Sequence, residues 1–250
     1  MPWPEDQLTY DAFLGGQINA WQPRQGYRAA TDAVFLAAAT EAQAGQTVLE
    51  LGCGAGVALL CLNARVPDLM MTGVERQGSY AELARRNLGQ VARIVTCDLT
   101  ALPVDLRQQG FDHVIANPPY YPAGGGTSAN DAGREAALRT DTPLSAWIEV
   151  ASRRLAPKGW LTVIQLTERL PEIMATLHPL LGSISVRPLA SREGHPAKRV
   201  LLRARKGGRA PFTLLPPLVL HEGDHHPGDG SHYTPMADAI QRHGATLPWS

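Results

Sequence analysis

A cluster of three glycines between an apolar run and a helical run constrains this chain most strongly. The cluster, GCGAG, occupies residues 52–56, directly after the apolar residues 47–51 and before a helical pattern at 57–64. Glycine lets the backbone turn sharply and approach a ligand closely. Strand, glycine turn and helix in this order favour an α/β fold that binds a nucleotide-type cofactor, and a purely structural turn is the alternative.

The rest of the chain alternates in the same way. Apolar runs predict strands at residues 47–51, 70–75, 92–97, 111–116 and 159–166, with helices at 57–64, 79–88, 143–155 and 168–178. Apolar strands linked by helices indicate a parallel sheet covered on both faces. Strands at 184–189 and 199–205 are close enough to form an antiparallel hairpin. The predicted fold class is α/β and Rossmann-like: a seven-stranded, mostly parallel sheet with an antiparallel edge strand and helices on both faces.

We interpret the 250 residues as a single domain, because a chain of this length buries one large core. Residues 1–45 are predicted to cover the cofactor and substrate end of the sheet, with a helix at 31–41 that has Thr31 or Asp32 near its N-cap. Residues 46–208 form the core, in which Thr142 is expected to cap the helix at 143–155. Residues 209–250, rich in glycine, proline and histidine, read as a partly flexible tail.

Charge composition alone does not indicate a nucleic-acid binder, since Lys+Arg and Asp+Glu both number 23. Binding RNA would require clustered basic residues that neutralise phosphates. Basic residues do cluster between 187 and 209, and the candidates for RNA contact are Arg192, Lys198, Arg199, Arg203, Arg205 and Lys206. A solvated strand edge and loop is the equally weighted alternative.

Cysteine usage and the chain's start predict a cytoplasmic protein. Three cysteines without a CxxC pattern fit a reducing compartment and argue against a zinc cluster. The first residues lack the basic and apolar regions of a signal peptide, and no apolar run reaches the ~20 residues of a membrane span. We therefore expect no membrane, no metal and a monomer. The histidines and aspartates between Asp224 and His232 are interpreted as a surface loop rather than a metal site.

The residues around the glycine turn indicate which cofactor it binds. Glu50 precedes the turn, and an acid there would repel a pyrophosphate but suits the amino and sulfonium groups of S-adenosylmethionine. Glu75 ends the next strand, where an acid holds ribose hydroxyls in related folds. Asp98, after Cys97 and the third strand, is placed to accept a hydrogen bond from the cofactor adenine.

The tetrapeptide Asn117-Pro118-Pro119-Tyr120 follows the fourth strand, at the end of the sheet where ligands bind. Its prolines stiffen the chain and remove two backbone donors. The Asn117 side-chain oxygen and the Pro118 carbonyl can then hold both hydrogens of an NH2 group, and Tyr120 offers a flat face to a planar substrate. Two fixed acceptors favour the charge that develops when such a poorly nucleophilic nitrogen attacks a methyl group. A rigid turn is the structural alternative.

With these residues the chain resembles the bacterial valine-tRNA adenine N6-methyltransferases, a family of class I methyltransferases. The narrowing features are QP–GYR–D at residues 22–32, NPPYY at 117–121, AKRVLLRARKGG at 197–208 and the closing His221 and Tyr233-Thr234. The resemblance runs from about Leu8 to Met236. It implies that Glu50, Gly52, Cys53 and Gly54 line the methionine end of S-adenosylmethionine, while Glu75, Cys97 and Asp98 hold its nucleoside.

The same resemblance assigns the substrate and its contacts. Asn117 and Pro118 would hold the amino group of the adenine beside the anticodon of a valine tRNA, and Tyr120 would stack on it. Tyr27, Arg28 and Asp32 would cover the cofactor. Two other hypotheses remain open. A protein glutamine N5-methyltransferase of release factors would use the same NPPY geometry, but fewer than fifty residues precede Glu50 here, whereas those enzymes carry a separate helical domain. A non-catalytic protein that binds cofactor and RNA is the second.

Overall fold

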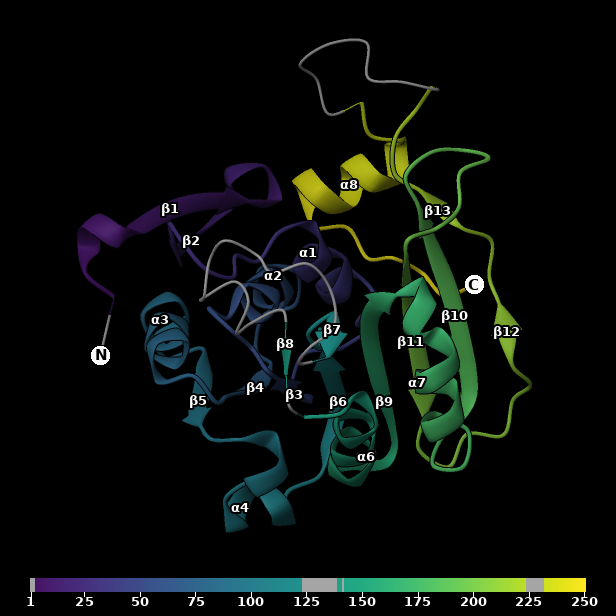
Figure 1. Cartoon of the computed structure of the whole chain (residues 1–250), viewed down its shortest axis with the longest axis horizontal. Coiled ribbons are helices and arrows are strands. Elements are labelled where there is room, and N and C mark those ends of the chain that lie inside the picture. Colours follow the sequence, from purple (N-terminus) through teal and green to yellow (C-terminus); the bar gives the residue numbers. More distant parts are fainter. Residues whose placement is uncertain (1–2, 123–138, 141, 224–231) are drawn as a thin grey trace.

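A mostly parallel sheet with helices on both faces forms the centre of the molecule, as seen in a computed structural model that describes residues 3–122, 139–140, 142–223 and 232–250 (Figure 1). Within these residues the main sheet runs β12-β10-β11-β9-β6-β3-β4-β5, with β13 also pairing with β10. Its strands are β3 (Thr47–Leu51), β4 (Met70–Glu75), β5 (Ala92–Thr96), β6 (Phe111–Ala116), β9 (Leu155–Leu166), β10 (Gly182–Ala190), β11 (Arg199–Arg205), β12 (Thr213–Leu214) and β13 (Leu218–Val219).

The predicted strands and fold class are confirmed, but the sheet has nine strands among the described residues rather than seven, and the antiparallel strand has a different position. β10 and β11 form the expected antiparallel hairpin. β11 also pairs antiparallel with β9, so the antiparallel strand lies between β9 and β10 rather than at the edge. The reason is topological: β10 forms one place away from β9, and the returning strand β11 fills the gap. The two short strands β12 and β13 then add to the outer side of β10.

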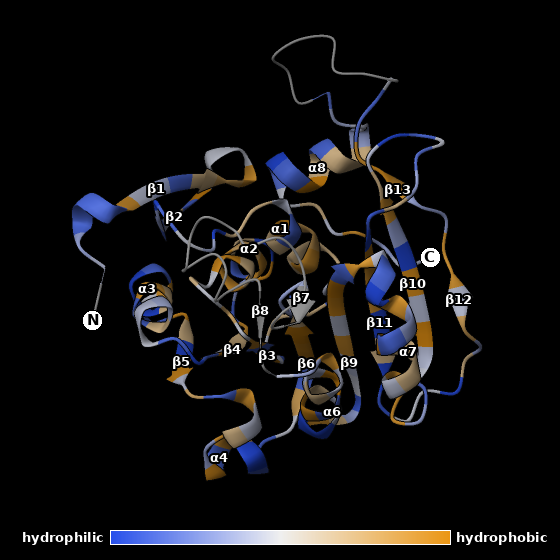
Figure 2. Ribbon diagram, in the orientation of Figure 1, coloured by the Kyte–Doolittle hydropathy of each residue, from blue (hydrophilic) through white to orange (hydrophobic). Residues whose placement is uncertain are grey.

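Helices cover the two faces of this sheet. They are α1 (Thr31–Ala38), α2 (Val57–Arg65), α3 (Gly78–Leu88), α4 (Val104–Gln108), α6 (Leu144–Arg154), α7 (Leu170–Leu177) and α8 (Pro235–His243). Alternate residues of each strand point to opposite faces, so Val48 joins the core beneath α1, α2 and α8, while Leu49 joins the core beneath α6 and α7. Figure 2 shows β6 hydrophobic along most of its length, as a strand buried on both faces must be. Among the described residues no helix is long and apolar enough to cross a membrane.

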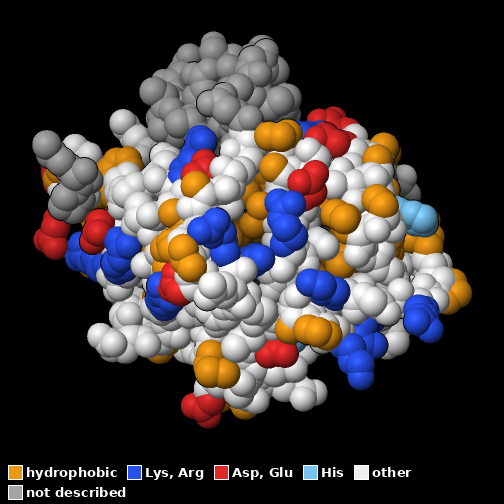
Figure 3. Space-filling view, turned by 90° about the horizontal axis from the view of Figure 1, so that it is seen from below, with side chains coloured by type: hydrophobic (Ala, Val, Ile, Leu, Met, Phe, Trp, Pro, Cys, Tyr) orange, Lys and Arg blue, Asp and Glu red, His pale blue; other side chains and the backbone are white. Residues whose placement is uncertain are grey.

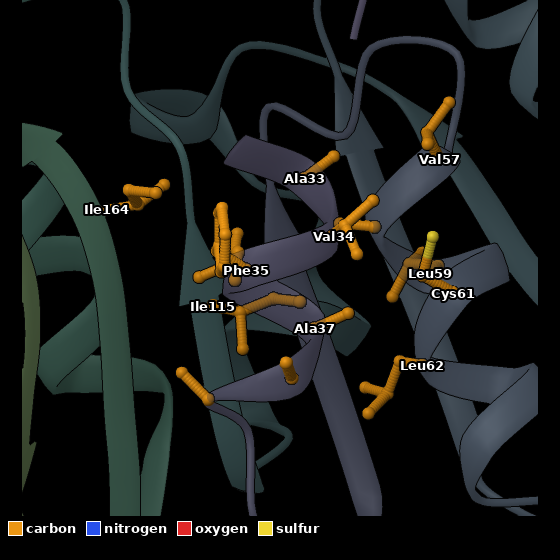
Figure 4. Packing of buried hydrophobic residues seen from close by; sticks show 14 of the residues in the cluster. Ala33, Val34, Phe35, Ala37, Val57, Leu59, Cys61, Leu62, Ile115 and Ile164 are labelled. Carbon is orange, nitrogen blue, oxygen red and sulfur yellow. The ribbon is translucent and has the colours of Figure 1, made fainter. Parts of the chain in front are cut away.

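Helix α1 is the packing partner that brings the N-terminal region onto the sheet. Figure 4 shows its side chains, Val34 and Phe35 among them, facing those of α2 and the strand residues Ile115 and Ile164. The helix begins at Thr31 with Ala30 as N-cap and ends at Ala38. Neither Thr31 nor Asp32 caps it, and α6 likewise has Pro143 rather than Thr142 as N-cap.

An N-terminal β-hairpin precedes α1 and was not predicted from the sequence. β1 (Leu8–Phe13) pairs antiparallel with β2 (Ile18–Pro23). Asn87 of α3 holds it: its side-chain oxygen accepts from the amide of Trp21, and its side-chain nitrogen donates to the carbonyls of Trp21 and Ala55. Because Ala55 belongs to the glycine turn, the hairpin lies against that turn.

The C-terminal segment is packed onto the domain in its described parts. Beyond β12 and β13, helix α8 contacts α1. The amide of Leu247 donates to the carbonyl of Ala38, and the indole of Trp249 donates to the carbonyl of Ala39. The predicted tail thus contributes strands, a helix and buried apolar side chains to the fold.

Candidate active site

The glycine turn and the NPPY segment leave the sheet side by side. β3 and β6 are parallel neighbours, with Leu51 opposite Ala116 in the register. The next residues, Gly52 and Asn117, therefore start from adjacent positions at the carboxyl edge. In open α/β sheets this edge binds ligands. The two segments singled out from the sequence are brought together by the topology.

The glycines of the turn are required by backbone conformation and by close neighbours. Gly52, Gly54 and Gly56 have φ values of 68°, 53° and 81°, in the left-handed region. A Cβ on Gly52 would lie 2.5 Å from the ring of Trp147 on α6, and a Cβ on Gly56 would lie 2.6 Å from Leu88. The indole of Trp147 therefore packs directly against the turn and supports it from the α6 side.

Replacing Gly52 with alanine is expected to lower the free energy of unfolding by roughly 2 kcal/mol, from the left-handed backbone and the clash with Trp147 together. Gly54→Ala is the matched control. Its φ is also positive, but its Cβ would meet Tyr27 at an ordinary 3.6 Å, so roughly 1 kcal/mol is expected. Urea unfolding of both variants measures the difference. Equal losses would show that Trp147 does not restrict the turn.

Glu50 has a buried carboxyl group that pairs with no cationic side chain among the described residues. Its side chain is 3% exposed, and its Oε2 accepts no hydrogen bond from the described residues. Burial raises the pKa of Glu50 well above its usual range, and the neighbouring Glu75 raises it further. An uncompensated buried charge is unfavourable unless a ligand completes it. The site therefore fits a ligand that carries positive charge.

Glu75 supports the backbone of the glycine turn. Its Oε2 accepts from the amide of Gly54 at 3.0 Å, and its Oε1 accepts from the amide of Gln77 at 2.8 Å. Burial raises its pKa, although these hydrogen bonds oppose the shift. A carboxylate oxygen can accept a second hydrogen bond, so Glu75 retains the capacity to bind hydroxyl groups.

The other predicted cofactor residues lie at neighbouring strand ends. The amide of Cys97 donates to the carbonyl of Glu75, and the amide of Cys53 donates to the carbonyl of Val74. Asp98 caps the 3-10 turn Leu99–Ala101, with Oδ1 accepting from the amide and hydroxyl of Thr100. The side-chain hydrogen bond from Thr100 is the main reason why the pKa of Asp98 is lowered. Asp98 is thus held as a carboxylate.

Tyr27 joins the glycine turn to the NPPY segment. Its ring lies beside Gly54, and its hydroxyl accepts from Nδ2 of Asn117 at 3.4 Å. The hydroxyl of Tyr80 donates to its carbonyl. Burial raises the pKa of the Tyr27 phenol, so it stays protonated. Arg28, predicted beside it, instead pairs with Asp11 of the hairpin at 2.6 Å.

Tyr120 is anchored by a charged pair from two other elements. Its hydroxyl donates to Oδ2 of Asp32 on α1, and Nε of Arg199 on β11 lies 3.1 Å from the same oxygen. Burial raises the pKa of Asp32, and both partners oppose that shift. Arg169 donates to the carbonyl of Tyr120 at 2.9 Å. Asp32, expected over the cofactor, thus holds the ring of Tyr120, a role that spacing alone did not reveal.

Sequence reasoning missed Gln165. Its Nε2 donates to the carbonyl of Pro118 at 3.1 Å, and its side chain is fully buried at 0% exposure. The available signal was a polar residue near the end of the mostly apolar predicted strand 159–166. Pro118, whose carbonyl accepts this hydrogen bond, is itself buried, and Pro119 follows it before Tyr120.

Most of the predicted RNA-contacting residues are engaged within the chain. Arg192 is 6% exposed and donates to the carbonyls of Glu222 and Gly223, which corrects its assignment as an RNA contact. Arg203 pairs with Glu41 at 2.7 Å and lies over two tryptophan rings. Lys206 donates to two backbone carbonyls, and Arg205 to one. These side chains hold the β10–β11 hairpin and the C-terminal segment in place.

Two predicted features on the surface remain. Lys198 is exposed on the loop before β11. Figure 3, which views the molecule from the bottom of Figure 1, shows Lys and Arg side chains dispersed among hydrophobic and acidic ones on that face. Within the described part of the chain no cluster of three or more metal-ligating side chains occurs. Asp224, His225, His226 and Asp229 of the predicted surface loop lie outside the described residues.

Known proteins resemble the chain in both sequence and structure. The family model of the methyltransferase small domain matches residues 29–186. A Shewanella baltica (strain OS155) protein named tRNA1(Val) (adenine(37)-N6)-methyltransferase is 33% identical over 76% of this chain and 82% of its own length. A protein of the same name from Porphyromonas gingivalis (strain W83) is 32% identical over 86% and 89%.

Two solved structures share the fold. An Agrobacterium tumefaciens crystal structure, described as a predicted O-methyltransferase, has a TM-score of 0.71 and 28% identity, covering 86% of this chain and 98% of that one. The T. thermophilus 16S rRNA methyltransferase solved with AdoMet and guanosine has a TM-score of 0.56 and 20% identity, covering 80% of this chain and 50% of that one.

Proposed function

Because the chain belongs to the tRNA1(Val) (adenine(37)-N6)-methyltransferases and carries their methyltransferase small domain, we propose that this site methylates the N6 amino group of an adenine in RNA, namely adenine 37 of a valine tRNA. The chain is a methyltransferase of the class I, Rossmann-like kind. The observation that carries the proposal is that Asn117 and Pro118, the candidate acceptors, follow the strand next to the one that leads into the glycine turn.

S-adenosylmethionine is the proposed cofactor, and it supplies a methyl group on a positively charged sulfur. The buried carboxyl group of Glu50, whose Oε2 has no partner among the described residues, fits that charge, and Gly52, Cys53 and Gly54 let the backbone come close to the ligand. Glu75 would hold the ribose hydroxyls and Asp98, beside Cys97, the adenine. Tyr27, with residues 1–45 around it, would cover this end, while Arg28 acts through Asp11 and the hairpin.

The substrate amino group would be held between Asn117 and Pro118. The Nδ2 group of Asn117 is engaged by Tyr27, which directs its oxygen away from that hydroxyl. The Asn117 oxygen and the Pro118 carbonyl then accept both N–H bonds of the amino group. These hydrogen bonds become stronger as positive charge develops on the nitrogen. They therefore stabilise the transition state of methyl transfer more than they stabilise the bound substrate. No dedicated base is required, because the product proton leaves to water.

Tyr120 is the proposed platform for the adenine ring. Its hydroxyl is fixed by Asp32 and its carbonyl by Arg169, so both ends of the residue are positioned before the base arrives. A preformed aromatic face suits a base splayed out of an RNA loop. Lys198 is exposed and remains a candidate for a phosphate contact.

Incubation with methyl-labelled S-adenosylmethionine and separated pools of tRNA, rRNA and protein tests this function. The label is expected in the tRNA pool, and nuclease digestion should release N6-methyladenosine. Valine tRNA with adenine 37 replaced by guanosine is the matched control and should accept no label. Label in release factors instead would favour the glutamine methyltransferase, and binding of cofactor without transfer to any pool would favour a non-catalytic protein.

A further inference from the structure

Gln165 is a polar side chain at the end of an apolar row. Alternate residues of β9 point to one face, so Leu161, Val163 and Gln165 lie on the side of α6 and α7. Leu161 and Val163 belong to the apolar core there. Gln165 is 0% exposed. A buried amide is unfavourable unless its hydrogen bonds are made, so its partners explain why a glutamine can stand at this position.

Both ends of the Gln165 amide are engaged. Its Oε1 accepts from the amide of Leu166 at 2.8 Å, which fixes the orientation of the side chain. Its Nε2 then donates to the carbonyl of Pro118 at 3.1 Å. Oxygen and nitrogen have different partners, so a rotated amide would lose both hydrogen bonds. Gln165 therefore presents a donor to one defined oxygen.

The carbonyl of Pro118 has one remaining rotational freedom that this donor removes. The ring of Pro118 fixes its own φ, and the following Pro119 restricts its ψ to extended values. Within that range the carbonyl direction still varies. A carbonyl oxygen has two lone pairs, and a hydrogen bond from Gln165 to one of them leaves the second pointing in a defined direction.

We propose that Gln165 is a positioning residue for methyl transfer, which holds the Pro118 carbonyl so that its free lone pair meets one N–H bond of the substrate amino group. This inference rests on the proposed function of the NPPY segment. Gln165 does not touch the substrate. It acts through Pro118, just as Tyr27 acts through Asn117, so that the two acceptors have separate supports from different elements of the fold.

The test compares Gln165→Met and Gln165→Glu with the unchanged full-length enzyme in steady-state methyl transfer to valine tRNA. Methionine has a similar volume but no donor, and we expect kcat to fall roughly tenfold, since small misplacements of reacting groups reduce rates to this extent. The KM for tRNA and the Kd for S-adenosylmethionine should change less than twofold. Thr162→Val, a change of another buried polar residue on β9, controls for general loosening of the strand.

Gln165→Glu adds a readout that a purely structural role would not move. An ionised carboxylate repels the Pro118 carbonyl, whereas a protonated one donates to it. Burial raises the pKa of a carboxyl group, so the ratio of variant to unchanged kcat should rise as the pH is lowered from 8 to 6. The nearby charged groups Asp32, Arg199 and Arg169 are the same in both enzymes, and the ratio removes their contribution.

Failure of this inference and failure of the proposed function give different results. If the unchanged enzyme labels tRNA and Gln165→Met has a kcat within twofold of it, the positioning role is overturned and the function stands. A pH-independent ratio for Gln165→Glu would likewise overturn the role. If the unchanged enzyme labels neither tRNA nor protein, the function fails, and the role of Gln165 fails with it.

Discussion

Asn117→Ala is expected to lower kcat by about two to three orders of magnitude, the largest effect that we predict for a single side chain. The variant removes one of two oxygens that accept the substrate N–H bonds, and loss of one preorganised polar group elsewhere has cost this much. Asn117 follows β6 and contacts Tyr27 rather than the core. The fold and the affinity for S-adenosylmethionine should therefore barely change.

Asn117→Asp is the matched comparison for that variant. Aspartate keeps an acceptor oxygen at the same position but loses the N–H donated to Tyr27, so its kcat should lie at least tenfold above that of the alanine variant, by roughly 1.4 kcal/mol of barrier. Steady-state rates with saturating cofactor and tRNA give kcat for both variants. Near-normal turnover of Asn117→Ala would defeat the catalytic assignment.

Glu50→Gln is the second change with a large expected effect, and it should weaken cofactor binding while stabilising the free protein. Removing one partner of a buried charged pair costs about 3 kcal/mol, or about two orders of magnitude in Kd. In the free protein Glu50 is buried, with one oxygen unpartnered among the described residues. Folding forces Glu50 either to take up a proton or to bury a charge, and glutamine avoids both costs, so the free energy of unfolding should increase.

The pH dependence of the free energy of unfolding tests whether the buried carboxyl group of Glu50 causes this gain in stability. Its pKa is raised in the folded state by burial and by Glu75. The folded chain therefore keeps the proton over the pH range in which the unfolded chain releases it. The contribution of Glu50 to the free energy of unfolding is fully present below the unfolded pKa of about 4.3. It is lost as the pH rises from there through the raised pKa of the folded state. Glu50→Gln should flatten this fall.

Isothermal titration gives the Kd for S-adenosylmethionine, and urea unfolding at several pH values gives the stability. Glu75→Gln serves as the comparison, because the Glu75 oxygens already accept hydrogen bonds from Gly54 and Gln77. That variant should lose stability rather than gain it. An unchanged Kd in Glu50→Gln would rule out Glu50 as the partner of the cofactor's positive charge.

Regular patterns made much of this fold predictable. The strands beneath the site are mostly apolar, and β6 matches its predicted bounds residue for residue. The glycine turn could be predicted because a sharp backbone turn requires glycine. The role of NPPY could be predicted because its two oxygens suit a substrate amino group. In each case the signal lies within a few neighbouring residues. The N-terminal hairpin was not predicted because its first strand β1, LTYDAF, shows the alternation of polar and apolar residues only in part. The strand also ends at an irregular turn.

The contacts that tune the site could not be predicted, because they join residues far apart in the chain. Arg199 looked like a basic surface residue within a charged run, yet it pairs with Asp32, 167 positions earlier by the numbering, across β11 and α1. Gln165 stood out locally only as a polar residue in a mostly apolar strand, and nothing near it in the sequence indicated its partner Pro118. Charge and spacing show which residues could serve a function, whereas pairing between elements decides which of them stay available to a partner such as RNA.

The anchoring of Tyr120 by Asp32 and Arg199 has a consequence for the time at which the enzyme becomes competent. A nascent chain that has emerged from the ribosome only as far as β10 contains every residue proposed to touch the cofactor or the adenine base. It still lacks the guanidinium that neutralises Asp32. The NPPY segment is therefore synthesised well before its support is complete. We expect a growing chain to gain activity only after β11 has been inserted between β9 and β10.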